Sequence, residues 1–149
     1  MDLLKVPGAK LVHIPNASEE LIDRYECHDL RIEPDPQQMK SVLASANLVV
    51  HQAGAGMTAI CLLAGVPQVL VPTQLEQRMM CTKLISQGLA MGVDPDISRP
   101  LYEATITNAL SDQSLAVTTQ NLAKKYYGFD QKDQCEAMAL AINDILDAQ

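Results

Sequence analysis

The sequence predicts an α/β fold: a Rossmann-like parallel sheet of about five strands flanked by helices, followed by a C-terminal helical tail. Short apolar runs alternate with segments of helical periodicity, and this alternation is typical of βαβ units. Two of the runs, at 48–51 and 68–71, are rich in valine and leucine, as expected for strands that helices cover on both faces. After Gly92 only helical patterns follow, and these form the predicted tail.

The apolar runs predict strands at 10–14, 30–33, 48–51, 68–71 and 89–92. The segments between them predict helices at 18–26, 36–46, 57–64 and 76–87, and the tail predicts helices at 99–110, 114–127 and 134–147. Asp35 before Pro36 suits the start of the second helix, because aspartate caps helices and proline fits the first helical position. Gly65 and Gly88 lie where helices commonly end.

Length, charge and cysteine content exclude several classes of function. A chain of 149 residues predicts one domain, and a formal net charge of −7 argues against nucleic acid or an anionic membrane as partner. No apolar run is long enough to span a membrane and the first residues do not resemble a signal peptide, so a cytoplasmic protein is expected. The four cysteines form no CxxC pair, which predicts reduced thiols and neither a metal site nor a disulfide framework. No cofactor is expected.

A turn of small residues, Ala53 to Gly56, separates the strand at 48–51 from the next helix. Unpaired N–H groups at a helix start bind anions, phosphate above all, and glycine lets a ligand approach closely. A tight turn that packs a helix on a sheet has the same composition, so both interpretations stay open on the turn alone. The spacing also fits a dinucleotide site, but there the acidic residue ends the next strand, whereas Glu76 lies beyond Pro72. A dinucleotide is therefore disfavoured.

The block VVHQAGAGMTAICLLAGVPQVLVPTQLEQ, residues 49–77, resembles the donor-binding motif of nucleotide-sugar glycosyltransferases with the two-domain GT-B fold. Enzymes of the UDP-glycosyltransferase type and of glycosyltransferase families 1 and 28 carry this motif. The shared positions include the small-residue turn, the Ala-Gly-Val-Pro after the helix and the closing Glu-Gln. The likeness extends more weakly over residues 10–93. It implies that the chain is the C-terminal, donor-binding half of a GT-B fold.

The resemblance implies a role for each matching residue of the turn. Gly54, Ala55 and Gly56 match the small residues that face the donor's diphosphate through backbone N–H groups. Thr58, one turn further on, would add a hydroxyl contact. Gln52 stands where the family has a second histidine that commonly touches the diphosphate, and its amide can still donate a hydrogen bond.

At the far end of the motif, Glu76 and Gln77 match the acid–glutamine pair that binds the hydroxyls of the transferred sugar, for which a carboxylate and an amide are suited. His51 is a further candidate for the donor site. Ile60 departs from the family, which often has a glutamate there for the ribose hydroxyls, so ribose recognition is expected to differ or be absent. Ala53 replaces the first glycine of the turn, which restricts the available φ angles.

The resemblance also implies parts that residues 1–149 lack. In the family the acceptor site and the general base belong to a separate N-terminal domain, which would have to act in cis or in trans. The family's donor domain opens with a strand, a loop and a helix, and here only the last turn of that helix is recognisable, so a truncated domain is expected. In the order 3-2-1-4-5-6 the absent strand is the central one. We expect the sheet to close up, or a second copy to pair with its open edges as a homodimer.

The first hypothesis is therefore the donor-binding half of an inverting glycosyltransferase, which transfers a sugar from a UDP- or dTDP-sugar to an acceptor hydroxyl. Such a half is expected to be inactive alone. The alternatives are a non-catalytic binding or assembly module derived from this fold and half of a nucleotide-sugar epimerase. His13 and His28 are expected to be structural or at the surface, and no catalytic triad or metal-ligand spacing is present.

Overall fold

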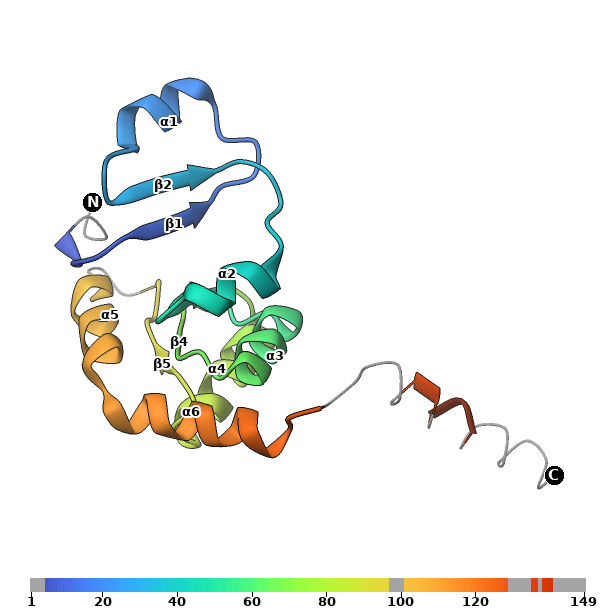
Figure 1. The fold of residues 1–149 in the computed structure, drawn as a ribbon. Helices are drawn as coiled ribbons and strands as arrows, with labels where there is room; N and C mark the ends of the chain where they lie inside the picture. The colour runs from blue at the N-terminus through green and yellow to red at the C-terminus, as the bar shows by residue number, and fades with distance from the viewer. Residues whose placement is uncertain (1–4, 97–100, 129–134, 137, 141–149) are drawn as a thin grey trace.

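The structure is a computed structural model that describes residues 5–96, 101–128, 135–136 and 138–140. Strands and helices alternate from β1 to β5, and two helices follow (Figure 1). The strands are β1 (Lys10–His13), β2 (Leu30–Glu33), β3 (Val49–His51), β4 (Gln68–Leu70) and β5 (Met91–Gly92). The helices are α1 (Glu19–Tyr25), α2 (Met39–Ser45), α3 (Ala55–Ala64), α4 (Leu75–Ser86), α5 (Tyr102–Ser111) and α6 (Gln113–Lys125).

The α/β class and the order of the elements are confirmed, but the predicted start of the second helix is wrong. The helix begins at Met39 and not at Pro36. The amide of Gln37 donates to the carbonyl oxygen of Asp35 and to the carboxylate of Glu33, each at 3.2 Å, and these contacts fit a non-helical course before the helix. The predicted helix at 134–147 falls largely outside the described residues.

The strands form two parallel sheets, β1–β2 and β3–β4–β5, where one sheet of about five strands was expected. The expected closure of the sheet is therefore wrong: β1 and β3 are not paired. Val6, just before β1, is buried with Val69 and Val93 in the core of the second sheet. Leu11 on β1 and Val50 on β3 remain 44% and 42% exposed.

The main core surrounds β4, whose three residues are all fully buried. Val69 faces the layer of α5, in a cluster with Ile106 and Ala109. Leu70 faces the opposite layer, in a cluster with Cys81 and Leu84 of α4. Helices therefore cover both faces of the second sheet, as the apolar strands predicted.

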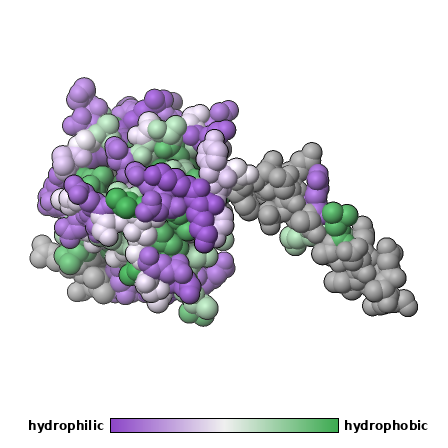
Figure 2. All heavy atoms as spheres, turned by 60° about the horizontal axis from the view of Figure 1, so that its bottom comes forward, coloured by the Kyte–Doolittle hydropathy of each residue, from purple (hydrophilic) through white to green (hydrophobic). Residues whose placement is uncertain are grey.

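Glycine ends α3 as predicted, because Gly65 adopts a left-handed φ of 70° at the C-cap. Gly88 has a φ of 66° and directly follows the C-cap of α4. Polar residues cover most of the face shown in Figure 2, where apolar residues form small separate areas. In the part of the chain that the structure describes, no helix is both long and apolar enough to cross a membrane.

Candidate functional site

The small-residue turn lies at the carboxyl end of β3, next to the carboxyl end of β4, because these two strands are parallel neighbours, and β5 lies beyond β4. The residues predicted for the diphosphate follow β3. Those predicted for the sugar follow β4, in the first turn of α4. The structure therefore brings the two predicted groups to the same edge of the sheet.

In the part of the chain that the structure describes, no side chain caps the start of α3. Gly54 is the N-cap, and the first helical bond runs from the N–H of Thr58 to the carbonyl oxygen of Gly54 at 3.0 Å. The N–H groups of the three residues between them have no acceptor within the helix. At the start of α6, by contrast, the Asp112 carboxylate accepts the N–H of Leu115 at 3.0 Å. The start of α3 thus keeps donors for another partner.

The fold itself does not require glycine at positions 54 and 56. A Cβ atom added to either residue would meet no atom of the described residues within 4 Å, and neither residue has a positive φ. Gly65 is different, because it has a positive φ and a Cβ there would lie 3.1 Å from the Cβ of Ala123. The space next to Gly54 and Gly56 is therefore open.

Ala53 adopts the left-handed conformation that alanine disfavours. Its φ is 62° and its side chain is buried, with 2% exposure. For an L-residue with a Cβ this conformation costs about 1–2 kcal/mol. The N–H of Ala53 donates to Nδ1 of His51 at 3.2 Å, which helps to hold the turn.

His51 is tied into the protein through both ring nitrogens. Since the N–H of Ala53 can only donate, Nδ1 is the acceptor, and the ring proton resides on Nε2. Nε2 then donates to Oε1 of Gln68 at 2.8 Å. Burial lowers the pKa of His51 below its usual value of 6.5, and the Gln68 hydrogen bond opposes this shift only in part. His51 is therefore neutral at neutral pH, and its role in the donor site stays a prediction.

The other residues predicted near the turn differ in accessibility. Gln52 is exposed, and Ile60 on α3 is 43% exposed. Thr58 is only 2% exposed, and its buried hydroxyl oxygen has no hydrogen-bond partner among the described residues. The hydroxyl contact expected of Thr58 stays a prediction.

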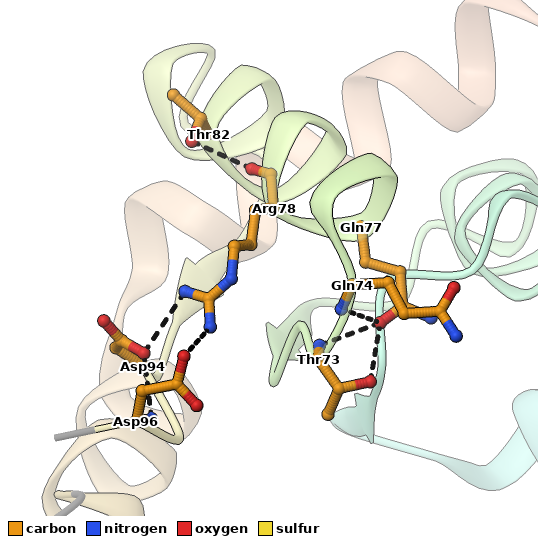
Figure 3. Close-up of polar contacts among 7 residues, drawn as sticks. All are labelled: Thr73, Gln74, Gln77, Arg78, Thr82, Asp94 and Asp96. Atoms are coloured by element: carbon orange, nitrogen blue, oxygen red, sulfur yellow. Dashed lines mark hydrogen bonds and ion pairs between the residues drawn. The ribbon is translucent and has the colours of Figure 1, made fainter.

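Gln77 anchors the start of α4 through its amide oxygen (Figure 3). Oε1 accepts the N–H of Thr73 at 2.9 Å, the hydroxyl of Thr73 at 3.1 Å and the N–H of Gln74 at 3.3 Å. Backbone N–H groups can only donate, so the atom at this position is the oxygen. Gln77 is left with its NH₂ group as a hydrogen-bond donor, and the neighbouring Glu76 carboxylate is exposed.

The other two histidines, His13 and His28, contact residues in and next to β2. Nδ1 of His13 lies 2.9 Å from the carbonyl oxygen of Glu33, and the fully exposed His28 ring lies 3.9 Å from the Asp29 carboxylate. Within the described ranges, no group of three or more histidine, cysteine or acidic residues is placed to hold a metal ion.

The Cys61 thiol is buried, and burial raises its pKa to about 11.

The structure adds residues that the sequence reasoning missed. The sequence did contain a signal for Gln68, because an amide side chain in a buried, valine-rich strand needs a hydrogen-bond partner inside the protein. Arg78 forms ion pairs with Asp94 and Asp96, which follow β5 (Figure 3). These partners are far apart in the sequence, and no local pattern indicates the pairing.

The fold and the turn define a class: an α/β domain of short parallel strands flanked by helices, with an open helix start at the carboxyl ends of the strands. A family model of the glycosyltransferase family 28 C-terminal domain matches residues 8–132. The chain belongs to this family.

The relatives are glycosyltransferases. Over 78 residues the chain is 35% identical to the O-mycaminosyltylonolide 6-deoxyallosyltransferase of Streptomyces fradiae, covering 51% of this chain and 18% of that protein. The structure of the glycosyltransferase SnogD from Streptomyces nogalater matches 95% of this chain and 37% of its own, with a TM-score of 0.74 and 16% identity. The glycosyltransferase VinC in complex with dTDP matches 89% of this chain and 34% of its own, with a TM-score of 0.71 and 18% identity. The chain spans only a minor part of each relative's length.

The strain at Ala53 leads to a prediction about stability. Ala53→Gly removes a buried methyl worth about 0.8 kcal/mol but also relieves about 1–2 kcal/mol of backbone strain. The free energy of unfolding is therefore expected to change by less than about 1 kcal/mol, given the greater freedom of glycine in the unfolded chain. Denaturant titration measures this change. The control is Ala109→Gly, a 2% exposed alanine within α5, which should lose about 2 kcal/mol. Equal losses in the two variants would show that the Ala53 turn is unstrained.

Proposed function

We propose that the chain is the donor-binding half of an inverting glycosyltransferase that uses a UDP- or dTDP-sugar. The observation that carries this proposal is the pair Gly54 and Gly56. Among the described residues no packing contact and no φ angle requires glycine there, and no side chain caps the helix start. Glycine at such a place is explained by the close approach of a ligand to the backbone. The family membership of the chain supports the same assignment.

The start of α3 would bind the diphosphate. Its free N–H groups and the positive end of the helix dipole favour an anion there. Gln52 lies beside them and is exposed, so its amide can reach a ligand. In a complete enzyme, donors aimed at the diphosphate would stabilise the negative charge that grows on the leaving group as the sugar is transferred. The dTDP present in the VinC structure supports a nucleoside diphosphate as ligand.

The start of α4 would bind the sugar with two complementary groups. The Glu76 carboxylate accepts hydrogen bonds from hydroxyl groups, and the NH₂ group of Gln77 donates to hydroxyl oxygens. Gln77 cannot accept through its oxygen, because three protein donors already occupy it. Gln77 would therefore act toward the sugar only as a hydrogen-bond donor.

The acceptor and the base would come from another domain. His51 uses both ring nitrogens inside the protein, so it is not free to take a proton from an acceptor hydroxyl. We therefore expect this half, placed in the cytoplasm, to bind a donor without turning it over. Binding of a nucleotide sugar distinguishes this function from that of a non-catalytic module without a ligand.

The glycine argument gives a direct test. Gly56→Ala should leave the free energy of unfolding unchanged or raise it by up to about 1 kcal/mol, because the new methyl meets no protein atom and alanine favours the helix. Its dissociation constant for dTDP, measured by calorimetry, should rise by about tenfold or more, a loss of about 1.4 kcal/mol. Ser114→Ala, at the same helical position in α6, is the control and should change nothing in dTDP binding. If wild type and Gly56→Ala bind dTDP equally, or neither binds, the diphosphate site is refuted.

The one-sided polarity of Gln77 gives a second test. Gln77→Glu keeps an oxygen for Thr73 and Gln74, and a carboxylate is favoured at a helix start by about 0.3–1 kcal/mol, so the fold should be retained. The NH₂ group of Gln77, a hydrogen-bond donor, is replaced by a carboxylate oxygen, which is an acceptor. The preference of the protein for dTDP-glucose over dTDP should therefore fall by about tenfold, as expected when one good hydrogen bond is lost. An unchanged preference would show that Gln77 only caps α4.

The open strand edges support the further proposal of a homodimer. The unpaired edges of β1 and β3 offer backbone groups to another chain. Sedimentation velocity should show a dimer that Val50→Lys, a charge on the exposed edge residue, converts to monomers. A wild-type protein that sediments as a monomer at all concentrations would rule out this assembly.

A further inference from the structure

We propose that Arg78 is a positioning residue for the sugar end of the donor, an inference that rests on the proposed function. Arg78, Asp94 and Asp96 form what we call the Arg78 clamp. The clamp joins the first turn of α4, which carries Glu76 and Gln77, to the segment that follows β5.

Apolar packing does not hold the first turn of α4. Leu75 is 76% exposed and Met79 is 67% exposed, and the first buried residue of the helix is Cys81. From Cys81 onward α4 lies close to β5, since a Cβ added to Gly92 would be 2.9 Å from Cys81 Sγ and 2.8 Å from Ile85 Cδ1. The turn that carries the sugar-binding residues precedes this close contact, so polar contacts must fix it.

Two polar anchors hold this turn from different sides. Gln77 binds the segment before the helix, through Thr73 and Gln74. Arg78 reaches the other way, with Nη1 3.3 Å from Oδ1 of Asp94 and Nη2 paired with the carboxylate of Asp96 (Figure 3). Anchors on two sides restrict rotation of the turn about the helix axis, which one anchor alone would allow.

The clamp is a connected network. Oδ1 of Asp94 also accepts the N–H of Asp96 at 3.0 Å, so the two acidic residues are fixed relative to each other. This backbone hydrogen bond and the Arg78 guanidinium hold the pKa of Asp94 below its usual value, and the carboxylate is charged at neutral pH. An isolated surface ion pair contributes little, but a planar guanidinium shared by two carboxylates sets a geometry that lysine cannot reproduce.

The Arg78 clamp should affect the binding of the sugar and not the binding of the diphosphate. The diphosphate would be held at the start of α3, and the turn before it packs through Ala53 in one cluster with Cys81 and Leu84, which lie beyond the first turn of α4. Hydrogen bonds to sugar hydroxyls are directional, and binding groups must be held within about 0.5 Å of their productive positions. A loosened first turn of α4 would therefore weaken only the contribution of the sugar to binding.

The experiment compares the dissociation constants of dTDP and dTDP-glucose, by calorimetry, for wild type and four variants. Arg78→Met should lower the preference for dTDP-glucose by about tenfold, and Arg78→Lys should restore only part of it. The triple variant Arg78→Met/Asp94→Asn/Asp96→Asn removes the uncompensated carboxylates, and it should bind dTDP like wild type yet still lack the preference. Lys83→Met, an exposed cation of the same helix, is the charge control and should behave as wild type.

Hydrogen exchange of the free protein tests the clamp without a ligand. The amides of residues 78 and 79 should exchange at least about tenfold faster in Arg78→Met than in Lys83→Met. Equal exchange, or an Arg78→Met variant that keeps the dTDP-glucose preference or loses both ligands equally, overturns the positioning role, as does a wild type that binds dTDP without preferring dTDP-glucose. A wild type that binds neither ligand but shows the exchange difference refutes the proposed donor site and leaves only a structural clamp.

Discussion

The complete burial of β4 is the constraint on which the candidate site at the carboxyl ends of the strands depends. Val69 packs under α5 and Leu70 packs against α4, so the strand is held between two layers and cannot shift toward either. Gln68 lies in the same buried strand, and its amide must find a partner inside the protein. It accepts from His51, and this hydrogen bond ties the end of β3 to β4 just before the small-residue turn. The position of the turn thus follows from the burial of a neighbouring strand.

Beyond the carboxyl ends of the strands, polar contacts and not apolar packing fix the starts of the helices. At the start of α6 the Asp112 carboxylate accepts the N–H of Leu115, and at the start of α4 the Gln77 side chain accepts the N–H groups of Thr73 and Gln74 just before the helix. The start of α3 has the same need for acceptors and no side chain to supply them. Its neighbour Ala53 holds a strained conformation that the surrounding packing must sustain. An open helix start maintained at such a cost is typical of a binding site.

The sequence predicted those features that are set by local patterns. The strands follow from apolar runs, and Gly65 ends α3 because glycine accepts the left-handed conformation. Asp35 and Pro36 show the limit of this reasoning, since the helix begins only at Met39 although Asp35 and Pro36 suit a helix start. The separation of the two sheets and the Arg78 clamp were not predictable in this way. Both depend on which distant segments pack together, and no local spacing encodes that.

The charges around the turn argue for recognition by dipoles. No lysine or arginine occurs from residue 41 to residue 77, and the chain has a formal net charge of −7. Arg78 follows directly, but two carboxylates already neutralise it. An anion at this edge would therefore be held by backbone N–H groups and the amide of Gln52, whose individual contributions are modest. Such a site gains affinity mainly from the rest of the ligand. A sugar held by Glu76 and Gln77, as proposed, would supply that contribution, and the placement of the first turn of α4 would then be as important as the proposed diphosphate contacts.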